Sequence, residues 1–149
     1  KEEDIRHQTQ VFWQEEVAHR IRPKVRDVIA HHRAQLDTLV LLTGSSKYLS
    51  KCALDVLEMD DILCTLFDVE GGCFTGEGTL CYGKGKLVKA QEYIDKIGGR
   101  WEDCSFYTDS YTDISVLEVV GHPVAVHPDP RLLRRARKSG WPVADWGNA

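Results

Sequence analysis

The chain has 149 residues, of which 42% are hydrophobic and 28% are charged, and its formal net charge is −4. This length and composition are typical of a globular domain with a sizeable core. A net negative charge offers no electrostatic case for nucleic-acid binding. No apolar run is long enough to cross a bilayer, so we expect neither a nucleic-acid partner nor a membrane.

The five cysteines are odd in number, and no two of them form a C-x-x-C pair. This pattern argues against a disulfide framework and against a structural zinc site. The first ten residues are charged and polar, unlike a secretory signal. We therefore expect a reducing, cytoplasmic setting.

The first half of the chain predicts two helices followed by a strand–helix–strand unit. Residues 1–35 carry apolar side chains at helical spacing, and Pro23 is expected to divide them and to lie in the first turn of the second helix. The nearly continuous apolar run 38–43 predicts a parallel strand buried on both faces. An amphipathic helix over 47–57 and a second strand near 62–66 follow.

The second half continues the alternation of strands and helices. Glycines in the stretch 71–78 predict a β-hairpin or flap, and residues 84–97 predict a helix that glycines stop. A strand at 105–107 precedes an apolar helical pattern, and a strand at 123–127 precedes a helix at 130–139. Residues 141–143 predict an edge strand, since proline cannot donate to a ladder. The alternation predicts an α/β fold with a parallel sheet and right-handed crossovers.

Two carboxylates, Asp109 and Asp113, follow the strand at 105–107 in the pattern D-S-x-x-D. Ligands of open α/β sheets bind just outside the carboxyl ends of the strands. Carboxylate oxygens suit Mg²⁺, which binds through one or two carboxylates with waters and phosphate oxygens. The alternative is that these residues only cap the following helix.

Two further features fit a phosphate site. Thr43 and Gly44 combine a hydroxyl, a glycine amide and a helix N-terminus, which together can bind an anion, although a simple helix cap is the alternative. Lys86 opens a helix, where a cation opposes the helix dipole; an ordinary solvated lysine is the alternative. With the two carboxylates, these groups could hold a phosphoryl group and neutralise its charge.

In chain order, Leu41-Leu42-Thr43, Lys86 and the T-D-S-x-x-D stretch at 108–113 resemble motifs II, III and IV of the haloacid dehalogenase-like superfamily. The likeness is to the branch with phosphoserine phosphatase-like enzymes. It continues through residues 21–23, 74–76, 121–132 and 140–143, and so covers nearly the whole chain. It implies a three-layer Rossmann-like core and a Mg²⁺-dependent phosphatase that passes through an aspartyl-phosphate and acts on a small phosphorylated metabolite.

The resemblance also implies roles for the matching residues. Thr43 would hydrogen-bond the phosphate with help from the Gly44 amide, and Lys86 would stabilise the phosphate and the charge of the nucleophile. Asp109 would be the direct Mg²⁺ ligand. Asp113 would orient metal-bound water or coordinate more remotely. Ser110 would support the loop.

The sequence departs from the family at motif I, a strand that ends in D-x-D-x-T and carries the nucleophile. The nearest imitation, residues 66–71 with Asp68 and Glu70, comes after motif II and lacks the threonine, so we reject it. Residues 1–20 are then expected to be the remnant of a helical cap with its return helix, and 21–149 the core. We expect the central motif I strand to be absent and the chain alone to be inactive. An N-terminal fragment of the same protein or a second copy would complete the sheet.

Two other interpretations stay open. One is a non-catalytic phosphate- or Mg²⁺-binding module, a degenerate relative of the family. The other is a flavodoxin-like or receiver-like domain, although these folds have their acidic residues and lysine in a different chain order. We expect His127 to be structural, with a substrate-side role as the alternative.

Overall fold

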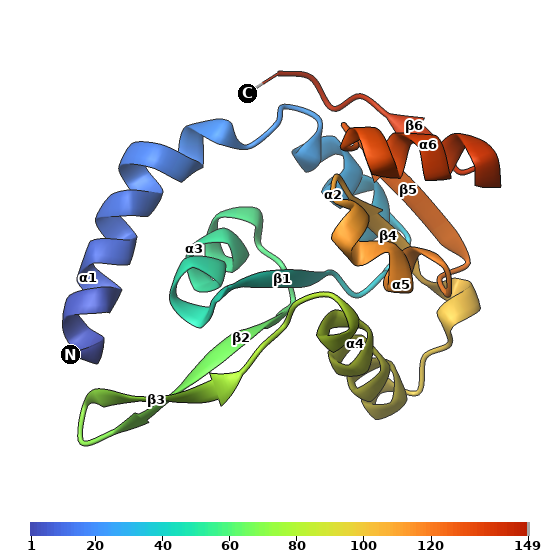
Figure 1. Ribbon diagram of the computed structural model, residues 1–149. Coiled ribbons are helices and arrows are strands. Elements are labelled where there is room, and N and C mark those ends of the chain that lie inside the picture. The colour runs from blue at the N-terminus through green and yellow to red at the C-terminus, as the bar shows by residue number, and fades with distance from the viewer. Residues whose placement is uncertain (149) are drawn as a thin grey trace. The chain divides into compact units, whose positions relative to one another are not determined.

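The computed structural model describes residues 1–148, which pack as two compact units (Figure 1). The first unit contains residues 1–81 with residues 147 and 148, and the second contains residues 82–146. Each unit has a three-stranded sheet of its own. The predicted division into a cap remnant, residues 1–20, and a core, residues 21–149, is of another kind than these two units, and it stays a prediction.

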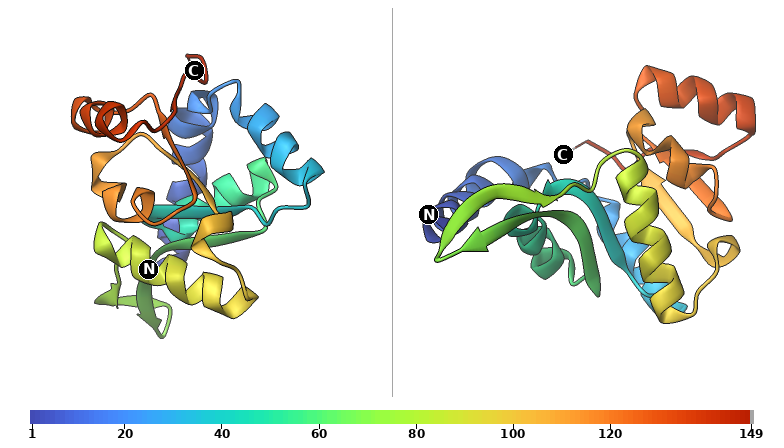
Figure 2. Two further views of the ribbon diagram at one scale, coloured as in Figure 1. Left: turned by 90° about the vertical axis from the view of Figure 1, so that its right-hand side faces the viewer. Right: turned by 60° about the horizontal axis from the view of Figure 1, so that its bottom comes forward.

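The sheet of the first unit has the strand order β1-β2-β3. Strands β1 (Val40–Ser46) and β2 (Asp61–Glu70) are parallel, and α3 (Lys47–Leu57) connects them and packs on both. Strand β3 (Cys73–Thr79) runs antiparallel to β2 and forms a long hairpin with it (Figure 2). The strand–helix–strand unit and the glycine-containing hairpin are both confirmed.

The helical start divides near Pro23, as predicted. Helix α1 (Glu2–Phe12) continues through a π-helical turn (Trp13–Val17) and a 3₁₀ turn (Ala18–Arg20), and α2 spans Val25–Ala34. Pro23 therefore lies before α2, so its predicted place in the first turn was wrong. The 3₁₀ turn ends at Arg20, the backbone of Ile21 is already extended, and α2 begins only at Val25, so Pro23 lies in the connection between the two helical segments.

The sheet of the second unit is parallel throughout, with the order β4-β5-β6. Its strands are β4 (Ser105–Thr108), β5 (His122–Val126) and β6 (Val143–Ala144), and its helices are α4 (Lys84–Ile97), α5 (Ile114–Leu117) and α6 (Pro130–Ser139). Strand β6 lies at the sheet edge, as predicted, but it begins directly after Pro142, two residues later than the start of the predicted range 141–143. A core of apolar side chains lies between α5, β5 and α6; its buried members are Leu117, Ala125, Leu132 and Ala136.

The predicted helix after Asp113 is shorter than its apolar pattern suggested. A 3₁₀ turn (Tyr111–Asp113) precedes α5, which has four residues. The chain then turns back to β5 at Gly121, whose N–H donates to the Trp101 carbonyl at 2.8 Å. A Cβ at Gly121 would lie 1.9 Å from the Glu102 carbonyl oxygen, so this close approach requires glycine.

The mixed α/β class with parallel strands is confirmed. Among residues 1–148, β1 pairs with β2 alone and β4 pairs with β5 alone, so each is the edge strand of its own sheet. In the same range, the helices are all too short or too polar to cross a membrane.

Candidate active site

The candidate site in the second unit is built on the acidic loop, residues 108–113, which follows β4. Thr108 folds this loop back on itself. Its Oγ1 accepts a hydrogen bond from the Ser110 N–H at 3.2 Å and donates one to Asp113 Oδ2 at 2.7 Å. Ser110 caps the following 3₁₀ turn, since its Oγ accepts from the Thr112 N–H at 3.3 Å. This is the loop support expected of Ser110.

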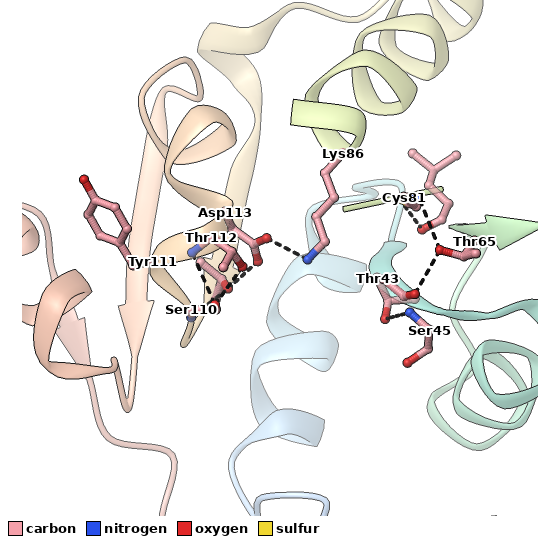
Figure 3. Close-up of polar contacts among 12 residues, drawn as sticks. Thr43, Ser45, Thr65, Cys81, Lys86, Ser110, Tyr111, Thr112 and Asp113 are labelled. Atoms are coloured by element: carbon pink, nitrogen blue, oxygen red, sulfur yellow. Dashed lines mark hydrogen bonds and ion pairs between the residues drawn. The ribbon is translucent and has the colours of Figure 1, made fainter. Parts of the chain in front are cut away.

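Lys86 and Asp113 form a buried ion pair (Figure 3). Lys86 Nζ lies 2.7 Å from Asp113 Oδ1, and the two side chains are only 11% and 4% exposed. That oxygen has no hydrogen-bond partner in the described part of the chain besides this contact with the ammonium. Because charges attract more strongly away from water, each of the two groups depends on the other.

Lys86 lies in the first turn of α4, which begins directly after Gly83. Gly83 has a positive φ of 54°, a conformation that favours glycine, and its carbonyl accepts from the Lys86 N–H at 3.1 Å. A cation at a helix N-terminus is electrostatically unfavourable. The carboxylate of Asp113 offsets this cost and fixes the position of the ammonium.

Asp109 has the opposite surroundings to Asp113, although it lies in the same loop. Its side chain is exposed and makes no hydrogen bond or ion pair with any residue in the range 1–148. Its backbone carbonyl accepts from the Asp129 N–H at 2.8 Å. Asp109 therefore keeps both carboxylate oxygens open, whereas both oxygens of Asp113 already have partners.

The donor set suits a cation that needs few protein ligands. The described residues contain no group of three or more His, Cys, Asp or Glu side chains that could hold a metal ion together. Mg²⁺ commonly binds through one or two carboxylates and fills its other positions with water and phosphate oxygens. An open carboxylate at Asp109 fits that requirement.

The second predicted element lies in the first unit, inside β1 rather than at its end, in the part where the register with β2 shifts between Leu42 and Ser46. Thr43 Oγ1 accepts a hydrogen bond from the Ser45 N–H at 3.1 Å, and Ser46 Oγ caps α3 by accepting from the Leu49 N–H at 3.5 Å. Gly44 is exposed, and its carbonyl accepts from Thr65 Oγ1 at 2.9 Å. Thr65 also accepts from the Cys81 N–H at 3.1 Å, so one hydroxyl joins this part of β1 to the chain at Cys81 (Figure 3).

Three supporting residues were missed in the sequence, although each carries a signal. Thr65 is a polar residue inside the apolar strand pattern of 62–66. Thr108 directly precedes the acidic pair, and Asp129 directly precedes Pro130, the arrangement of a helix N-cap followed by proline. Their partners could not be identified from these signals.

The structure brings Lys86 and Asp113 together and places Asp109 in the same loop. Thr43 and Gly44 belong to the other unit, so their convergence with Lys86 and Asp109 stays a prediction. His127 makes structural contacts: its Nε2 accepts from the Trp146 N–H at 2.8 Å and lies 3.1 Å from Asp145 Oδ1.

Comparison with known proteins supports the same family. The family model of haloacid dehalogenase-like hydrolases matches residues 1–118. A probable phosphatase of Mycobacterium tuberculosis is 36% identical over 118 residues, which cover 78% of this chain and 41% of the relative. A phosphoserine phosphatase of the same species is 29% identical over 137 residues, covering 91% and 44%. The chain thus spans less than half the length of these curated relatives.

A solved structure with a similar fold is a protein of unknown function from Bordetella pertussis. It has a TM-score of 0.87 and 26% sequence identity, and the match covers 96% of this chain and 66% of that one. The family match extends over well more than half of the chain, and it includes β1, α4 and the acidic loop. The chain therefore belongs to the haloacid dehalogenase-like hydrolases.

Proposed function

We propose that this chain provides the phosphate- and metal-binding parts of a Mg²⁺-dependent phosphatase that acts on a small phosphomonoester of the phosphoserine kind. The observation that carries the proposal is the contrast within the acidic loop. A buried Lys86–Asp113 pair fixes a cation, while Asp109 beside it keeps an open carboxylate. A fixed ammonium and an open carboxylate are the groups needed to receive a phosphate dianion together with a divalent cation.

Asp109 would hold the Mg²⁺ ion, which would supply a Lewis acid that neutralises charge on the phosphoryl oxygens. Lys86 would stabilise the phosphate and the nucleophile. An ammonium has three N–H donors, and the contact with Asp113 uses one of them, which leaves two for these anions. Asp113 would hold Lys86 in place and would orient water rather than bind the metal directly, since both of its oxygens have partners.

Thr43 and Gly44 would bind phosphate oxygens. Thr43 Oγ1 already accepts from the Ser45 N–H, so its own O–H can donate to a phosphate oxygen. Gly44 is exposed and has no side chain, which lets a phosphate approach the backbone closely. Thr65 would keep this part of β1 in shape through its bond to the Gly44 carbonyl.

The nucleophile would be an aspartate outside this chain. Its carboxylate would attack phosphorus as the ester P–O bond breaks and the alcohol leaves, and water would then hydrolyse the aspartyl-phosphate. The strand that carries it, from an N-terminal fragment or a second copy, would pair with a strand edge such as that of β1. Residues 1–20 would be the remnant of a helical cap, and the cytoplasm the cellular setting.

The test is hydrolysis of phosphoserine and other small phosphomonoesters with Mg²⁺, by this chain and by the product of the gene read from its first codon. We expect the chain alone to be inert and the gene product to be active. Asp109→Asn in the gene product should lower kcat by about 100-fold or more, as expected for a metal-held transition state. Asp103→Asn is the control, since Asp103 is an exposed carboxylate that pairs with Arg100. Activity that needs no Mg²⁺, or that survives Asp109→Asn, would contradict the proposal.

A non-catalytic Mg²⁺- or phosphate-binding module is the second candidate. It is favoured by the acidic loop itself, in which only Asp109 has open carboxylate oxygens. Beryllium fluoride with Mg²⁺ separates the two candidates, because a stable adduct requires an aspartyl nucleophile. A gene product that binds Mg²⁺ but forms no adduct would support the module and reject the phosphatase.

A further inference from the structure

Asp129 connects the segment after β5 to the acidic loop after β4. Its carboxylate caps α6, with Oδ1 accepting from the Arg131 and Leu132 N–H groups, both at 2.8 Å. The other oxygen, Oδ2, accepts from the Tyr111 N–H at 2.6 Å. The backbone N–H of Asp129 donates to the Asp109 carbonyl at 2.8 Å. One residue therefore holds the loop on both sides of Ser110.

The first turn of α6 also holds the side chain of Tyr111. The Arg131 guanidinium lies 3.8 Å from the centre of the Tyr111 ring, which is within cation–π distance. The ring packs against the apolar core of the second unit and points away from Asp113 (Figure 3). Tyr111 is thus fixed at its amide by Asp129 and at its ring by Arg131.

Asp109 depends on these contacts because its own side chain has none among residues 1–148. The direction of a carboxylate without side-chain partners is set by its backbone. Asp129 holds the backbone around Asp109 at two points, the Asp109 carbonyl and the Tyr111 N–H. Hydrogen bonds from the Leu132 and Tyr111 amides lower the pKa of the Asp129 carboxyl. At neutral pH this group is therefore an anion that can accept from all three amides.

We propose that Asp129 is a positioning residue that fixes the Asp109 carboxylate in the orientation needed to bind a divalent cation. An ordinary helix cap requires only the bonds to Arg131 and Leu132. The two bonds to the acidic loop join segments 18 and 20 residues apart and are not needed to cap α6. Only the identity of the cation rests on the phosphatase function proposed above; the support of the loop does not.

Asp129→Ser separates the two roles of this side chain. Serine is a good N-cap residue, but its single oxygen cannot serve both α6 and the Tyr111 amide. The matched control is Arg134→Gly, which weakens α6 at an exposed position and leaves the loop untouched. Asp129→Asn, which keeps the shape of the side chain but loses one acceptor, serves as the second variant if the serine variant fails to fold.

Two quantities are measured on the full chain: amide hydrogen exchange at Tyr111, and the dissociation constant of Mg²⁺ added alone. In Asp129→Ser we expect Tyr111 exchange to be about tenfold faster or more, and the Mg²⁺ dissociation constant to rise about 10- to 100-fold, the range for residues that orient metal ligands. Arg134→Gly should lower the melting temperature but should change neither the amide exchange at Tyr111 nor the Mg²⁺ dissociation constant.

The proposal is overturned if Asp129→Ser leaves Tyr111 exchange as it is in the wild type. It is also overturned if Arg134→Gly weakens Mg²⁺ binding as strongly as Asp129→Ser does. A third outcome is that the wild type binds no Mg²⁺ although Asp129→Ser speeds amide exchange at Tyr111. This result would confirm that Asp129 holds the acidic loop and would reject the metal-binding function. The two failures are therefore distinguishable.

Discussion

Two segments that carry predicted site residues, the Thr43–Gly44 part of β1 and the acidic loop after β4, are each held by one threonine hydroxyl with a different kind of partner. In the first unit, Thr65 donates to the neutral Gly44 carbonyl and accepts from the Cys81 N–H. In the second unit, Thr108 donates to the Asp113 carboxylate and accepts from the Ser110 N–H. The carboxylate is in turn paired with buried Lys86. A threonine hydroxyl thus stabilises a neutral part of β1 in one unit and a charged network in the other, and the charged network should be far more sensitive to substitution.

The sharpest test of this comparison removes the buried cation. Lys86→Met leaves the Asp113 carboxylate buried without a counter-charge, so we expect a loss of about 3–5 kcal/mol in the free energy of unfolding, measured by urea denaturation. Lys84→Met, at an exposed position in the same turn of α4, is the matched control and should change stability by about 0.5 kcal/mol or less. The double variant Lys86→Met/Asp113→Leu should recover most of the loss, because it leaves no unpaired charge. Equal costs for Lys86→Met and Lys84→Met would mean that the pair is not buried in solution.

The next largest effect is expected at Thr108, the hydroxyl of the charged network. Thr108→Val keeps the shape but removes the donor to Asp113 and the acceptor for the Ser110 N–H, so we expect a loss of about 1.5–3 kcal/mol. Thr108→Ser keeps the hydroxyl and should lose clearly less. In the Lys86→Met background, the cost of Thr108→Val should differ from its cost in the wild type, because both residues act on Asp113. Strict additivity would show that they do not form one network.

The neutral counterpart, Thr65, should be less sensitive. Thr65→Val leaves the Gly44 carbonyl and the Cys81 N–H without this partner in a site that is 4% exposed, and we expect a loss of about 1–2 kcal/mol. Thr65→Ser is the control that keeps the hydroxyl. A larger loss for Thr65→Val than for Thr108→Val would reverse the comparison between the two segments.

Sequence reasoning located the helices and strands around both segments because their signals are local. Glycines marked the hairpin and the end of α4, and continuous apolarity marked β1. The contacts that distinguish the segments are not local: Thr65 and Gly44 are 21 residues apart, and Asp129 and Tyr111 are 18 apart. Nothing in a single sequence specifies which polar groups meet across such separations, since the packing of strands and helices decides it.

The acidic pair shows the same limit at close range. The D-S-x-x-D pattern marked both Asp109 and Asp113 as candidates for metal or water, but it could not indicate that one would be exposed and the other buried against Lys86. That difference arises because the 3₁₀ turn directs Asp113 inward, to Thr108 and to the first turn of α4. Position along the loop alone carries no such information.

The smallest predicted effect concerns Glu2, whose carboxylate lies outside the core. It extends the comparison of hydroxyl partners from a buried charge to a more exposed one. Glu2 accepts a hydrogen bond from the Tyr48 hydroxyl at 2.9 Å, and this bond, with nearby Lys47 and Arg6, lowers the pKa of Glu2. A lowered pKa in the folded state means that the stabilisation is fully present above the ordinary pKa of a glutamate and is lost as the pH falls through the lowered value.

Tyr48→Phe should therefore reduce the free energy of unfolding at neutral pH by less than Thr65→Val does, and the difference from the wild type should shrink on acidification. Tyr82→Phe, at an exposed tyrosine, is the control, and urea denaturation at a series of pH values is the measurement. A Tyr48→Phe loss that stays constant down to the acid limit of folding would show that Glu2 is not the partner that matters, and that α1 is attached to α3 by other contacts.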